Sequence, residues 1–348
     1  MRAVTVRPGE PGSARLEQVA EPDPDAGPVL VRTLAIGICG TDREIVSGRY
    51  GWPPPGSDRL ILGHESLGRV EEAPSGGGFA PGDWVVAIVR RPDPVPCVAC
   101  AAGEWDMCRN GRYAECGIKE RDGFAAERFR CEPAFLVRTD PGLGGLAVLL
   151  EPASVVAKAW EHIERIGGRA LWRPRTVLVT GAGPVGLLAA LLGVQRGLEV
   201  HVLDRVTHGR KPGLVQDLGA TYHTGGVADL GFAPDIVVEC TGAPSVVAEI
   251  IGRTAPAGIV CLAGVSSGGR ELTLDLGALN RVMVLENDVV FGSVNANRRH
   301  YEAAASALAR ADRAWLARLI SRRVPLGRWD EALLRHPDDV KVVLDLTL

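Results

Sequence analysis

Short apolar runs separated by turn residues fill roughly the first 150 positions of the chain. Segments such as VLVRTLAIGI and DWVVAIV stand between clusters of glycine and proline. Runs of this length, with turn residues on both sides, predict short strands joined by turns. The first part of the chain is therefore expected to be mainly β.

The pattern changes near residue 150, where segments with the apolar spacing of helices begin to alternate with apolar strands. The stretch AVLLEPASVVAKAWEHIERIG has the apolar spacing of a helix, and RTVLVTGAGPVGLLAALLGVQRG is typical of an apolar strand, a glycine-rich turn and a second helix. Four further segments, VHVLD, DIVVECTG, GIVCLAG and VVFGSV, are apolar throughout, as buried parallel strands are. We predict a doubly wound α/β domain over residues 155–298.

The end of the chain has a pattern of its own. From RRHYEAAASALAR to DDVKVVLDLTL it predicts a helix, a connecting stretch and a last strand. We expect this segment, residues 299–348, to return to the first domain, residues 1–154. A chain of 348 residues is long enough for two such domains, each with its own core.

Charge and composition narrow the class of partner. The formal net charge is −3 and no run of Lys and Arg is present, whereas nucleic acid is bound by a concentrated basic face. The start, MRAVTVRPGEPG, lacks the apolar core of a signal segment, and no stretch has the ~18 consecutive apolar residues of a membrane span. We expect a small-molecule ligand, no nucleic-acid or membrane partner, and a cytoplasmic location.

A glycine-rich turn carries the first chemical signal. Gly181, Gly183 and Gly186 form G-A-G-P-V-G, with Pro184 and Val185 before the last glycine. In such a turn the first glycine permits the tight bend, the second lets a pyrophosphate approach the backbone, and the third packs helix on strand. The turn is predicted to bind a dinucleotide. The alternative is a structural loop without a nucleotide.

Asp204 bears on the choice of dinucleotide. It ends the next predicted strand, about 20 residues later, where a carboxylate can bind both ribose hydroxyls. Its charge would repel a 2′-phosphate, which favours NAD. Arg205 and Arg210 follow closely and would partly offset that repulsion, so NADP stays an alternative. The other interpretation of Asp204 is a solvated strand end.

Cys39 in GICGTDREIVSGRYG and His64 in GHES are candidate metal ligands. A nicotinamide cofactor moves hydride, and oxidation of an alcohol also removes its O–H proton, which a Lewis-acidic metal assists. Zinc has no redox chemistry of its own, and thiolate, imidazole and carboxylate ligands leave one position open to the substrate. The alternative is a Cys39 that packs as a small apolar residue and a His64 bonded to backbone.

The chain resembles the zinc-dependent medium-chain alcohol dehydrogenases and, among them, the archaeal-type glucose 1-dehydrogenases. The motifs that carry the resemblance run nearly from end to end: GICGTDREIVSGRYG, GHES, PGDWVVAIVRRP, CVACAAGEWDMC, ECGI with DGF, LLEPASVVAKA, the glycine-rich turn, GSVNANRRHYEAA and PLGRWDEAL. GTDREI and VNANRRH belong to the glucose dehydrogenase branch in particular. The resemblance implies an α/β fold with a Rossmann doubly wound parallel sheet and a mainly β GroES-like catalytic domain.

The resemblance also implies a ligand set for the catalytic zinc. The family's ligands correspond to Cys39 and His64, with Glu65 and Glu151 as carboxylate candidates. Many relatives have a cysteine at the last position, so Glu151 implies a harder and more labile zinc site. The alternative for Glu65 is a place behind the ligands.

Roles for the neighbouring residues follow from the same resemblance. Thr41 matches the family hydroxyl that accepts the substrate proton, and Asp42 orients the site from behind. Alcohol dehydrogenases often have a histidine three residues after that hydroxyl, where this chain has Glu44, so a relay through Glu44 stays open. Asn295 is expected to help seat the nicotinamide ring.

The family's sugar-facing positions correspond to Glu115 and His300, with Glu151 close by. Carboxylate and imidazole groups can bond several hydroxyls at once, which suits a polyol. Val89 stands where some relatives have an asparagine that reaches the sugar, so a polyhydroxylated substrate in general is an alternative to an aldose. The other interpretation of Glu115 and His300 is a solvated surface position.

Cys97, Cys100 and Cys108 occupy the place of the family's structural zinc lobe, which uses four cysteines. The first of the four is missing, and Asp93 or Cys116 would complete a tetrahedral site. The alternative is a lobe held by packing alone, with free thiols. The remaining cysteines stand in apolar segments and are expected in the core: Cys131, Cys240 and Cys261.

These motifs together predict a zinc- and NAD(P)-dependent dehydrogenase of a sugar or cyclitol, with oxidation of D-glucose at C1 as the leading case. One alternative is a dehydrogenase of another polyol, including one from a biosynthetic pathway. The other is a nucleotide-binding protein without turnover on the same fold, although binding alone needs no metal-activated alcohol. Because family members are commonly dimers or tetramers, a homo-oligomer is expected.

Overall fold

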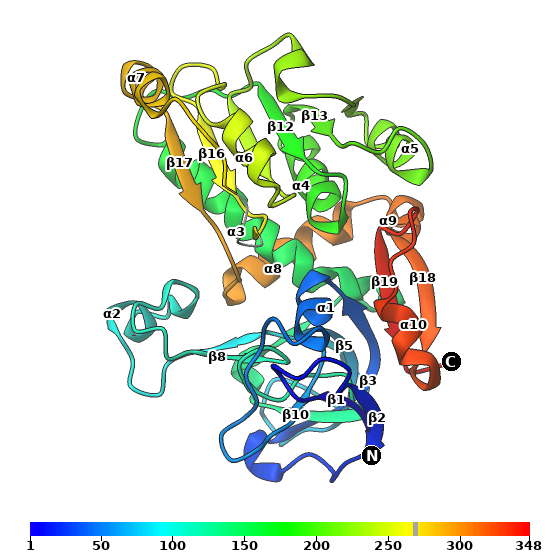
Figure 1. The fold of residues 1–348 in the computed structure, drawn as a ribbon. Coiled ribbons are helices and arrows are strands. Elements are labelled where there is room, and N and C mark those ends of the chain that lie inside the picture. Colours follow the sequence, from blue (N-terminus) through cyan, green and yellow to red (C-terminus); the bar gives the residue numbers. More distant parts are fainter. Residues whose placement is uncertain (267–270) are drawn as a thin grey trace. The chain divides into compact units, whose positions relative to one another are not determined.

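The computed structural model describes residues 1–266 and 271–348 of the chain. These residues form two compact units (Figure 1). The first unit combines Met1–Ser154 with Asn295–Leu348, and the second unit is Val155–Val294.

A largely antiparallel sheet forms the centre of the first unit, in the order β11-β6-β5-β3-β19-β18. β3 pairs with β5 on one side, and with β10 and β19 along the two halves of its other side. Its burial alternates at first and is then continuous, as expected for a strand that runs into the middle of a core. The strands are β3 (Val29–Ile38), β5 (Glu65–Glu72), β6 (Trp84–Ala87), β10 (Arg128–Cys131), β11 (Leu136–Arg138), β18 (Ile320–Pro325) and β19 (Lys341–Asp345).

Two small sheets complete the β structure of the first unit. One has the order β2-β1-β4 and the other β7-β8-β9. The chain between β7 and β8 forms a separate lobe that carries α2 and the 3-10 helix η2, drawn in cyan in Figure 1. The bounds are β1 (Arg2–Val6), β2 (Arg15–Gln18), β4 (Leu60–Ile61), β7 (Arg90–Arg91), β8 (Ala114–Cys116), β9 (Glu120–Arg121), α2 (Val98–Ala101) and η2 (Trp105–Met107).

Helices of the first unit border this β core. α8 presents Tyr301, Ala304 and Leu308 as a buried stripe at helical spacing. The N-cap of α8 is Asn297. Because the first unit resumes at Asn295, the domain boundary predicted at residue 298 lies just inside the first unit. The bounds of these helices are α1 (Gly40–Val46), α8 (Arg298–Arg310), α9 (Arg313–Leu319), α10 (Trp329–Leu333), η1 (Pro24–Ala26), η3 (Pro133–Phe135), η4 (Pro141–Leu149) and η6 (Leu326–Arg328).

The second unit is built on a parallel sheet in the order β14-β13-β12-β15-β16-β17. The strand order reverses between β12 and β15, and ligands of such sheets bind at the carboxyl end of this switch point. The four inner strands are short and almost fully buried, which explains their continuous apolar sequences, whereas the two edge strands are partly exposed. They are β12 (Thr176–Thr180), β13 (Glu199–Leu203), β14 (Thr221–His223), β15 (Ile236–Glu239), β16 (Ile259–Leu262) and β17 (Val289–Gly292).

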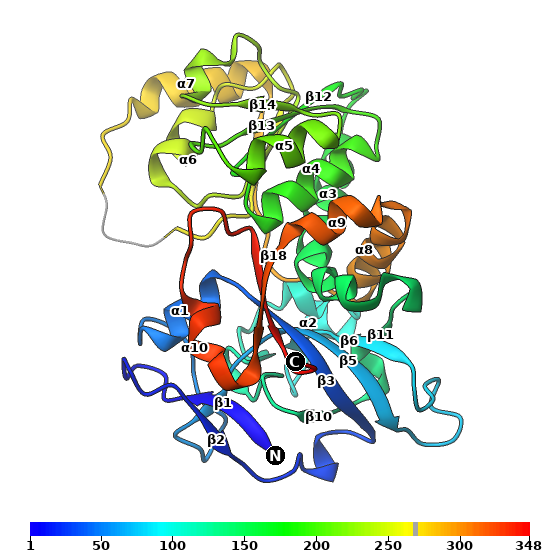
Figure 2. The same cartoon turned by 90° about the vertical axis from the view of Figure 1, so that its right-hand side faces the viewer.

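Helices cover both faces of this sheet, as right-handed crossovers require. α4 packs against β12 and β13, and α5 packs against β14. Figure 2 shows these two helices together with α6 and α7 around the strands. The doubly wound parallel sheet predicted from the sequence is thereby confirmed. The helices are α4 (Pro184–Val194), α5 (Arg210–Asp217), α6 (Pro244–Ile250), α7 (Leu276–Glu286) and η5 (Val227–Leu230), and α3 (Leu150–Gly167) leads from the first unit into the second.

One helical stretch, Pro141–Gly167, is long and apolar enough to cross a membrane by length and composition. It contains η4 and α3, and 72% of its most apolar window is buried. A helix whose apolar side chains are covered by the rest of the chain is typical of a protein core.

Candidate active site

The start of α1 positions the Cys39 thiol. Cys39 is the N-cap residue, and Asp42 Oδ2 accepts a hydrogen bond from its backbone N–H at 2.8 Å. The backbone N–H of Thr41 donates to Cys39 Sγ at 3.2 Å. The capping arrangement therefore fixes the position of the sulfur atom, and the residue whose N–H bonds this atom, Thr41, is the one that carries the candidate hydroxyl.

His64 brings its imidazole to this sulfur from the strand region before β5. Its Nε2 lies 3.2 Å from Cys39 Sγ, and its Nδ1 lies 3.4 Å from Asp42 Oδ1. Burial opposes protonation, yet the negative charges of Cys39 and Asp42 raise the pKa of His64 well above its ordinary value. A carboxylate behind a ligating imidazole fixes its orientation and is typical of metal sites. Asp42 thus holds the place predicted for it.

Glu65 completes the group and is held by a cation. Its two carboxylate oxygens each accept a hydrogen bond from Lys341 Nζ at 2.6 Å, and both side chains are almost completely buried. Gly37 lies opposite Glu65 on β3, and a Cβ at that position would come within 1.9 Å of Glu65 Oε2. Only a glycine leaves room for this carboxylate. Lys341 is not predicted from the sequence, where its one signal is a lysine in the apolar strand KVVLD.

Ligand atoms of Cys39, His64 and Glu65 all lie within 4.8 Å of one another. Thiolate, imidazole and carboxylate are the donor types that zinc takes in proteins, so the residues present fit this metal. The alternative in which Cys39 and His64 are ordinary core residues, with His64 bonded to backbone, does not describe this geometry.

Glu151, at the start of α3, is also buried but is not a member of this tight group. Burial raises its pKa to about 7, and the negative charge of Glu65 adds to the shift, while His64 and Lys341 oppose it. The carboxyl group therefore lies within electrostatic reach of the cluster. The structure brings both predicted carboxylates to the site, with Glu65 nearer to the other two ligands.

Glu44 lies on α1, about one turn after Thr41. Its carboxylate accepts no hydrogen bond from the residues that the structure describes, whereas its backbone oxygen accepts bonds from Ser47 and Arg49. Its side chain is half-buried. The geometry thus leaves the predicted relay from Thr41 through Glu44 as an expectation.

The two predicted sugar-facing residues are buried, so their interpretation as solvated surface positions is wrong. Glu115 Oε1 accepts hydrogen bonds from Arg90 Nη2 at 2.9 Å and from Asn295 Nδ2 at 2.6 Å. His300 lies in the first turn of α8, where its Nδ1 accepts a bond from the Asn297 N–H at 3.0 Å. The amide of Asn295, predicted to seat the nicotinamide ring, is engaged with Glu115 in this structure.

In the second unit, the glycine-rich turn has the geometry that its sequence predicts. Gly181 has a φ of 91°, in the left-handed region where glycine is favoured. Gly183 is the N-cap of α4, Pro184 is its first residue, and Val185 follows. A Cβ at Gly186 would lie 1.8 Å from the Gly181 carbonyl oxygen, so α4 packs directly on the turn. The turn thus exposes the start of α4 as a phosphate cradle.

Asp204 is bound to this turn and is not a solvated strand end. Its Oδ2 accepts bonds from the Ala182 N–H at 2.7 Å and from Lys211 Nζ at 3.2 Å, and its Oδ1 accepts from the Val206 N–H at 2.9 Å. The side chain is 9% exposed. The sequence predicts Arg205 and Arg210 as the cations near Asp204, whereas in the structure Lys211 is the one that bonds its carboxylate.

The lobe brings together three thiols. Sγ atoms of Cys97, Cys100 and Cys108 lie within 4.8 Å of one another. Backbone N–H groups of Arg109 and Cys100 lower the pKa of Cys97 to about 6, while burial raises that of Cys100 to about 11. A thiol that ionises this readily is a good metal ligand.

Neither candidate for the fourth lobe ligand belongs to this group. The Asp93 carboxylate accepts bonds from the Val95 N–H at 2.8 Å and from Asn110 Nδ2 at 2.7 Å. Cys116 is buried on β8 and lines a cavity instead. Of the cysteines expected in the core, Cys131 and Cys261 are fully buried and Cys240 is half-buried.

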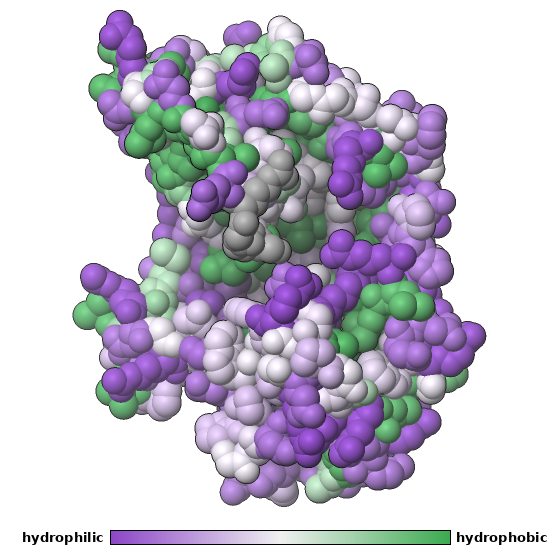
Figure 3. Space-filling model, in the orientation of Figure 1, coloured by the Kyte–Doolittle hydropathy of each residue, from purple (hydrophilic) through white to green (hydrophobic). Residues whose placement is uncertain are grey.

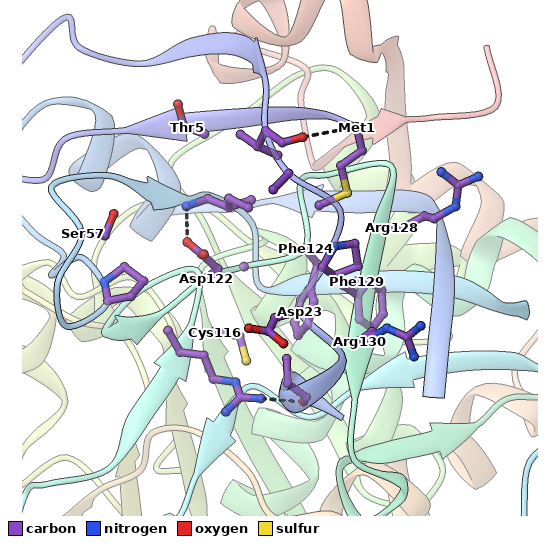
Figure 4. Close-up of a pocket in the computed structure, with 18 of the residues that line it drawn as sticks. Met1, Thr5, Asp23, Ser57, Cys116, Asp122, Phe124, Arg128, Phe129 and Arg130 are labelled. Atoms are coloured by element: carbon purple, nitrogen blue, oxygen red, sulfur yellow. Dashed lines mark hydrogen bonds between the residues drawn. The ribbon is translucent and has the colours of Figure 1, made fainter. Parts of the chain in front are cut away.

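That cavity, of about 510 Å³, is lined by Cys116 together with Asp23, Asp122, Phe124 and Phe129 (Figure 4). Since side chains alternate along a strand, Cys116 faces it while Glu115 faces the other way. Its polar walls are already paired within the chain: Asp122 accepts from the Ile61 N–H at 2.8 Å, and Arg121 donates to the Ala26 carbonyl at 3.3 Å. Apart from Cys116, none of the candidate zinc, sugar-facing or cofactor residues lines this cavity, so it is distinct from the candidate active site.

Two family models match the chain: Alcohol dehydrogenase GroES-like domain over residues 25–141, and Glucose dehydrogenase C-terminus over residues 144–346. Similar proteins include the glucose 1-dehydrogenase of Methanocella arvoryzae, 42% identical over 357 residues, and that of Thermoproteus tenax, 43% identical over 352 residues. Each match covers 99% of both chains.

A solved structure gives the same result. Haloferax mediterranei glucose dehydrogenase, in complex with NADP, Zn and gluconolactone, matches with a TM-score of 0.92 at 32% identity, over 100% of both chains. The GroES-like and Rossmann fold class and the class of enzyme predicted from the sequence, a zinc- and NAD(P)-dependent dehydrogenase of sugars, are confirmed. The chain belongs to the glucose dehydrogenases of the zinc-dependent medium-chain alcohol dehydrogenase family.

Proposed function

We propose that this protein oxidises an aldose at C1, with D-glucose as the leading substrate, and transfers the hydride to NAD(P). The observation that carries the proposal is the buried cluster of Cys39, His64 and Glu65, backed by Asp42 and Lys341. A nucleotide-binding protein without turnover has no use for such a group. The gluconolactone bound to the Haloferax relative, an oxidation product of glucose at C1, supports the choice of substrate.

Cys39, His64 and one of the carboxylates Glu65 or Glu151 would hold the zinc. When bound, zinc supplies a Lewis acid and the dinucleotide supplies a hydride acceptor. The Thr41 hydroxyl, next to the Cys39 cap, accepts the proton of the reacting hydroxyl. Asp42 holds the His64 ring in place from its Nδ1 side.

Recognition of the sugar falls to Glu115 and His300, both buried in the first unit. A buried carboxylate that bonds a substrate hydroxyl discriminates strongly against analogues that lack it, because the carboxylate is then left unpaired. A polyhydroxylated substrate is therefore favoured over a simple alcohol.

The cofactor is NAD or NADP, bound with its pyrophosphate on the turn of Gly181, Gly183 and Gly186. Asp204 favours NAD by accepting bonds from the ribose hydroxyls. Lys211, 3.2 Å from Asp204 Oδ2, weakens the repulsion of a 2′-phosphate, which leaves NADP acceptable. The NADP complex of the Haloferax relative is consistent with this dual use.

The lobe thiols Cys97, Cys100 and Cys108 bind a second, structural zinc under this proposal. Three thiolates need one more ligand to complete a tetrahedral site. Asp93 can supply it only by giving up its bond to Asn110. A water molecule is the other source.

The protein is also proposed to act in the cytoplasm as a homodimer or homotetramer. α7 exposes Leu276, Val284 and Leu285, each more than 60% accessible, and Figure 3 shows apolar residues gathered on the surface near α7 and β17. Contiguous exposed apolar side chains mark interaction sites. Light scattering coupled to size-exclusion chromatography measures the subunit count, and a single-chain mass would refute this part.

A substrate screen tests the function itself. Aldoses, cyclitols and ethanol are offered with NAD or NADP, and the absorbance of the reduced nicotinamide is followed. The best aldose should exceed ethanol by at least ~100-fold in kcat/KM, since a pocket built for hydroxyls rejects ligands without them. Efficient turnover of ethanol would refute the sugar assignment, and a cyclitol as best substrate would replace the aldose.

A further inference from the structure

Glu115 is held in the first unit by more donors than any other candidate recognition residue. Its Oε1 accepts bonds from Arg90 Nε at 3.1 Å, from Arg90 Nη2 at 2.9 Å and from Asn295 Nδ2 at 2.6 Å. Its Oε2 accepts none from the residues that the structure describes. Nor is Oε2 one of the buried polar atoms without a partner, so solvent reaches it. One oxygen is thus fully used by the protein and the other is open.

Arg90 is itself immobilised. It lies directly opposite Glu115 in the β7–β8 pairing and is 4% exposed. Its Nη1 donates to the Asp106 carbonyl oxygen at 3.1 Å, and its guanidinium carbon lies 3.6 Å from the centre of the Tyr113 ring. Strand register, a backbone bond and a cation–π contact therefore set the position of the guanidinium independently of Glu115. Glu115 takes its orientation from Arg90, not the reverse.

The second donor comes from far along the chain. Asn295 is 180 residues from Glu115, and its backbone has a φ of 63°, in the left-handed region. Non-glycine residues adopt this conformation rarely, and mostly when the surrounding structure holds them there. The backbone conformation at Asn295 thus accompanies a side chain whose amide reaches Glu115.

We propose that Arg90 is the positioning residue of the substrate site: with Asn295 it saturates Glu115 Oε1 and so presents Oε2 to a hydroxyl of a neutral sugar. The inference rests on the proposed function, since it takes Glu115 to contact the sugar. Two consequences follow. First, the carboxylate cannot rotate to exchange its two oxygens, so it can bond a substrate hydroxyl at one position only. Second, the paired guanidinium neutralises the charge of the carboxylate, so a cationic substrate is not bound more tightly than a neutral one there.

The sharpest readout is discrimination between sugars. In the wild-type protein, the deoxy analogue of glucose that lacks the recognised hydroxyl should fall by ~100-fold or more in kcat/KM, because Oε2 is then left unpaired. Arg90→Met frees Glu115 to turn, so glucose should lose ~10- to 100-fold while the deoxy analogue loses little. The ratio should collapse to below about tenfold. Arg90→Lys, which keeps the charge without the fork, should restore only part of it.

Arg91 offers a matched control. It is the next residue, is 6% exposed, and points to the other face of the strand, where it donates to the Ile88 carbonyl and contacts Cys131 Sγ. Arg91→Met should lower the melting temperature and leave the discrimination between glucose and its deoxy analogue unchanged. The KM for the dinucleotide should stay within about twofold in the Arg90 and Arg91 variants, because its turn belongs to the second unit.

The experiment measures kcat and KM for D-glucose and its 2-, 3- and 4-deoxy analogues in each variant, with melting temperatures alongside. Folded Arg90→Met and Arg90→Lys proteins that keep wild-type discrimination overturn the inference and leave the proposed function standing. If Arg90→Met does not fold, Asn295→Ala replaces it, with a smaller collapse expected and an unchanged ratio again fatal to the inference. A wild-type protein that oxidises no sugar refutes the proposed function itself.

Discussion

The two clusters of metal-ligating side chains differ in what stands behind their ligands. In the cluster of Cys39, His64 and Glu65, every ligand touches a further group: Asp42 backs the first two and Lys341 the third. In the lobe, backbone N–H groups near Cys97 and Cys100 play that part, within one short loop between β7 and β8. Outer contacts tune and orient a metal for chemistry, whereas a compact set of thiols suffices to stabilise a loop.

This difference predicts which property of the protein, catalysis or stability, depends on each metal site. The buried cluster draws on residues from β3, β5, β19 and α1, so its geometry depends on the whole first unit. The lobe cluster depends on residues close in sequence. Damage to the first should therefore appear in catalysis, and damage to the second in stability.

The largest expected effect is the loss of turnover when a ligand of the buried cluster is removed. Cys39→Ser and His64→Ala should each lower kcat by at least ~1000-fold, because Lewis-acid stabilisation is worth several kcal/mol. Steady-state rates measure this, and fluorescence titration should show unchanged binding of the dinucleotide. A variant that keeps more than about a tenth of wild-type turnover contradicts the zinc mechanism.

The second prediction concerns the cation behind Glu65. Lys341→Met leaves a buried carboxylate without its partner, which should cost about 3–5 kcal/mol of the free energy of unfolding. Urea denaturation with a chelator present measures it, since Lys341 then holds Glu65 without help from a metal. Adding Glu65→Gln to Lys341→Met should recover part of the loss.

An exposed ion pair provides the control for that experiment. Arg138 lies 2.8 Å from Asp83 and its side chain is 56% exposed. Arg138→Met should cost less than ~1 kcal/mol, because solvent screens such pairs. Equal losses for Lys341→Met and Arg138→Met would show that the buried pair has no special part in the site.

A smaller effect is expected from the lobe. Metal analysis of the intact protein should find close to two zinc ions per chain, and Cys100→Ser should leave about one. Turnover per folded chain should change little, while the melting temperature falls by several degrees, at roughly 2–4 °C per kcal/mol for a chain of this size. A single zinc in the wild-type protein, lost together with activity, would rule out the lobe site.

The smallest effects on activity are expected from substitutions near the dinucleotide turn, which contains no residue of either metal cluster. Asp204→Asn keeps an acceptor for the Ala182 N–H but removes the charge, so the ratio of kcat/KM for NADP to NAD should rise about tenfold. Lys211→Met should move the same ratio the other way. A ratio that neither substitution changes would show that Asp204 and Lys211 do not read the ribose.

Residues close in sequence were the ones that could be predicted. Cys39 and its cap, the glycine-rich turn and the three lobe thiols follow from local spacing, and the structure brings each set together. Lys341 could not be found this way: it meets Glu65 across 276 positions, and only the pairing of β19 with β3 brings them into contact. No period or spacing in the sequence encodes that pairing.

Asp93 shows what spacing alone leaves out. Its spacing before Cys97 predicts a metal ligand, and in the structure one of its oxygens accepts a bond from the N–H two residues later, a turn that aspartate commonly makes. Local backbone bonding thus competes with metal binding for the same carboxylate. Asn295 is similar, since its amide is already engaged with Glu115.

The pairing of β19 with β3 also sets an order of events during synthesis on the ribosome. Val155–Val294 is one continuous stretch and can fold while the last 54 residues are still being made. The first unit cannot close its sheet until Lys341–Asp345 has emerged. Until then Glu65 has no ammonium group to neutralise it. Maturation of the metal centre therefore has to wait for Lys341, and a chain that is terminated before this residue lacks the centre's support while it keeps the second unit.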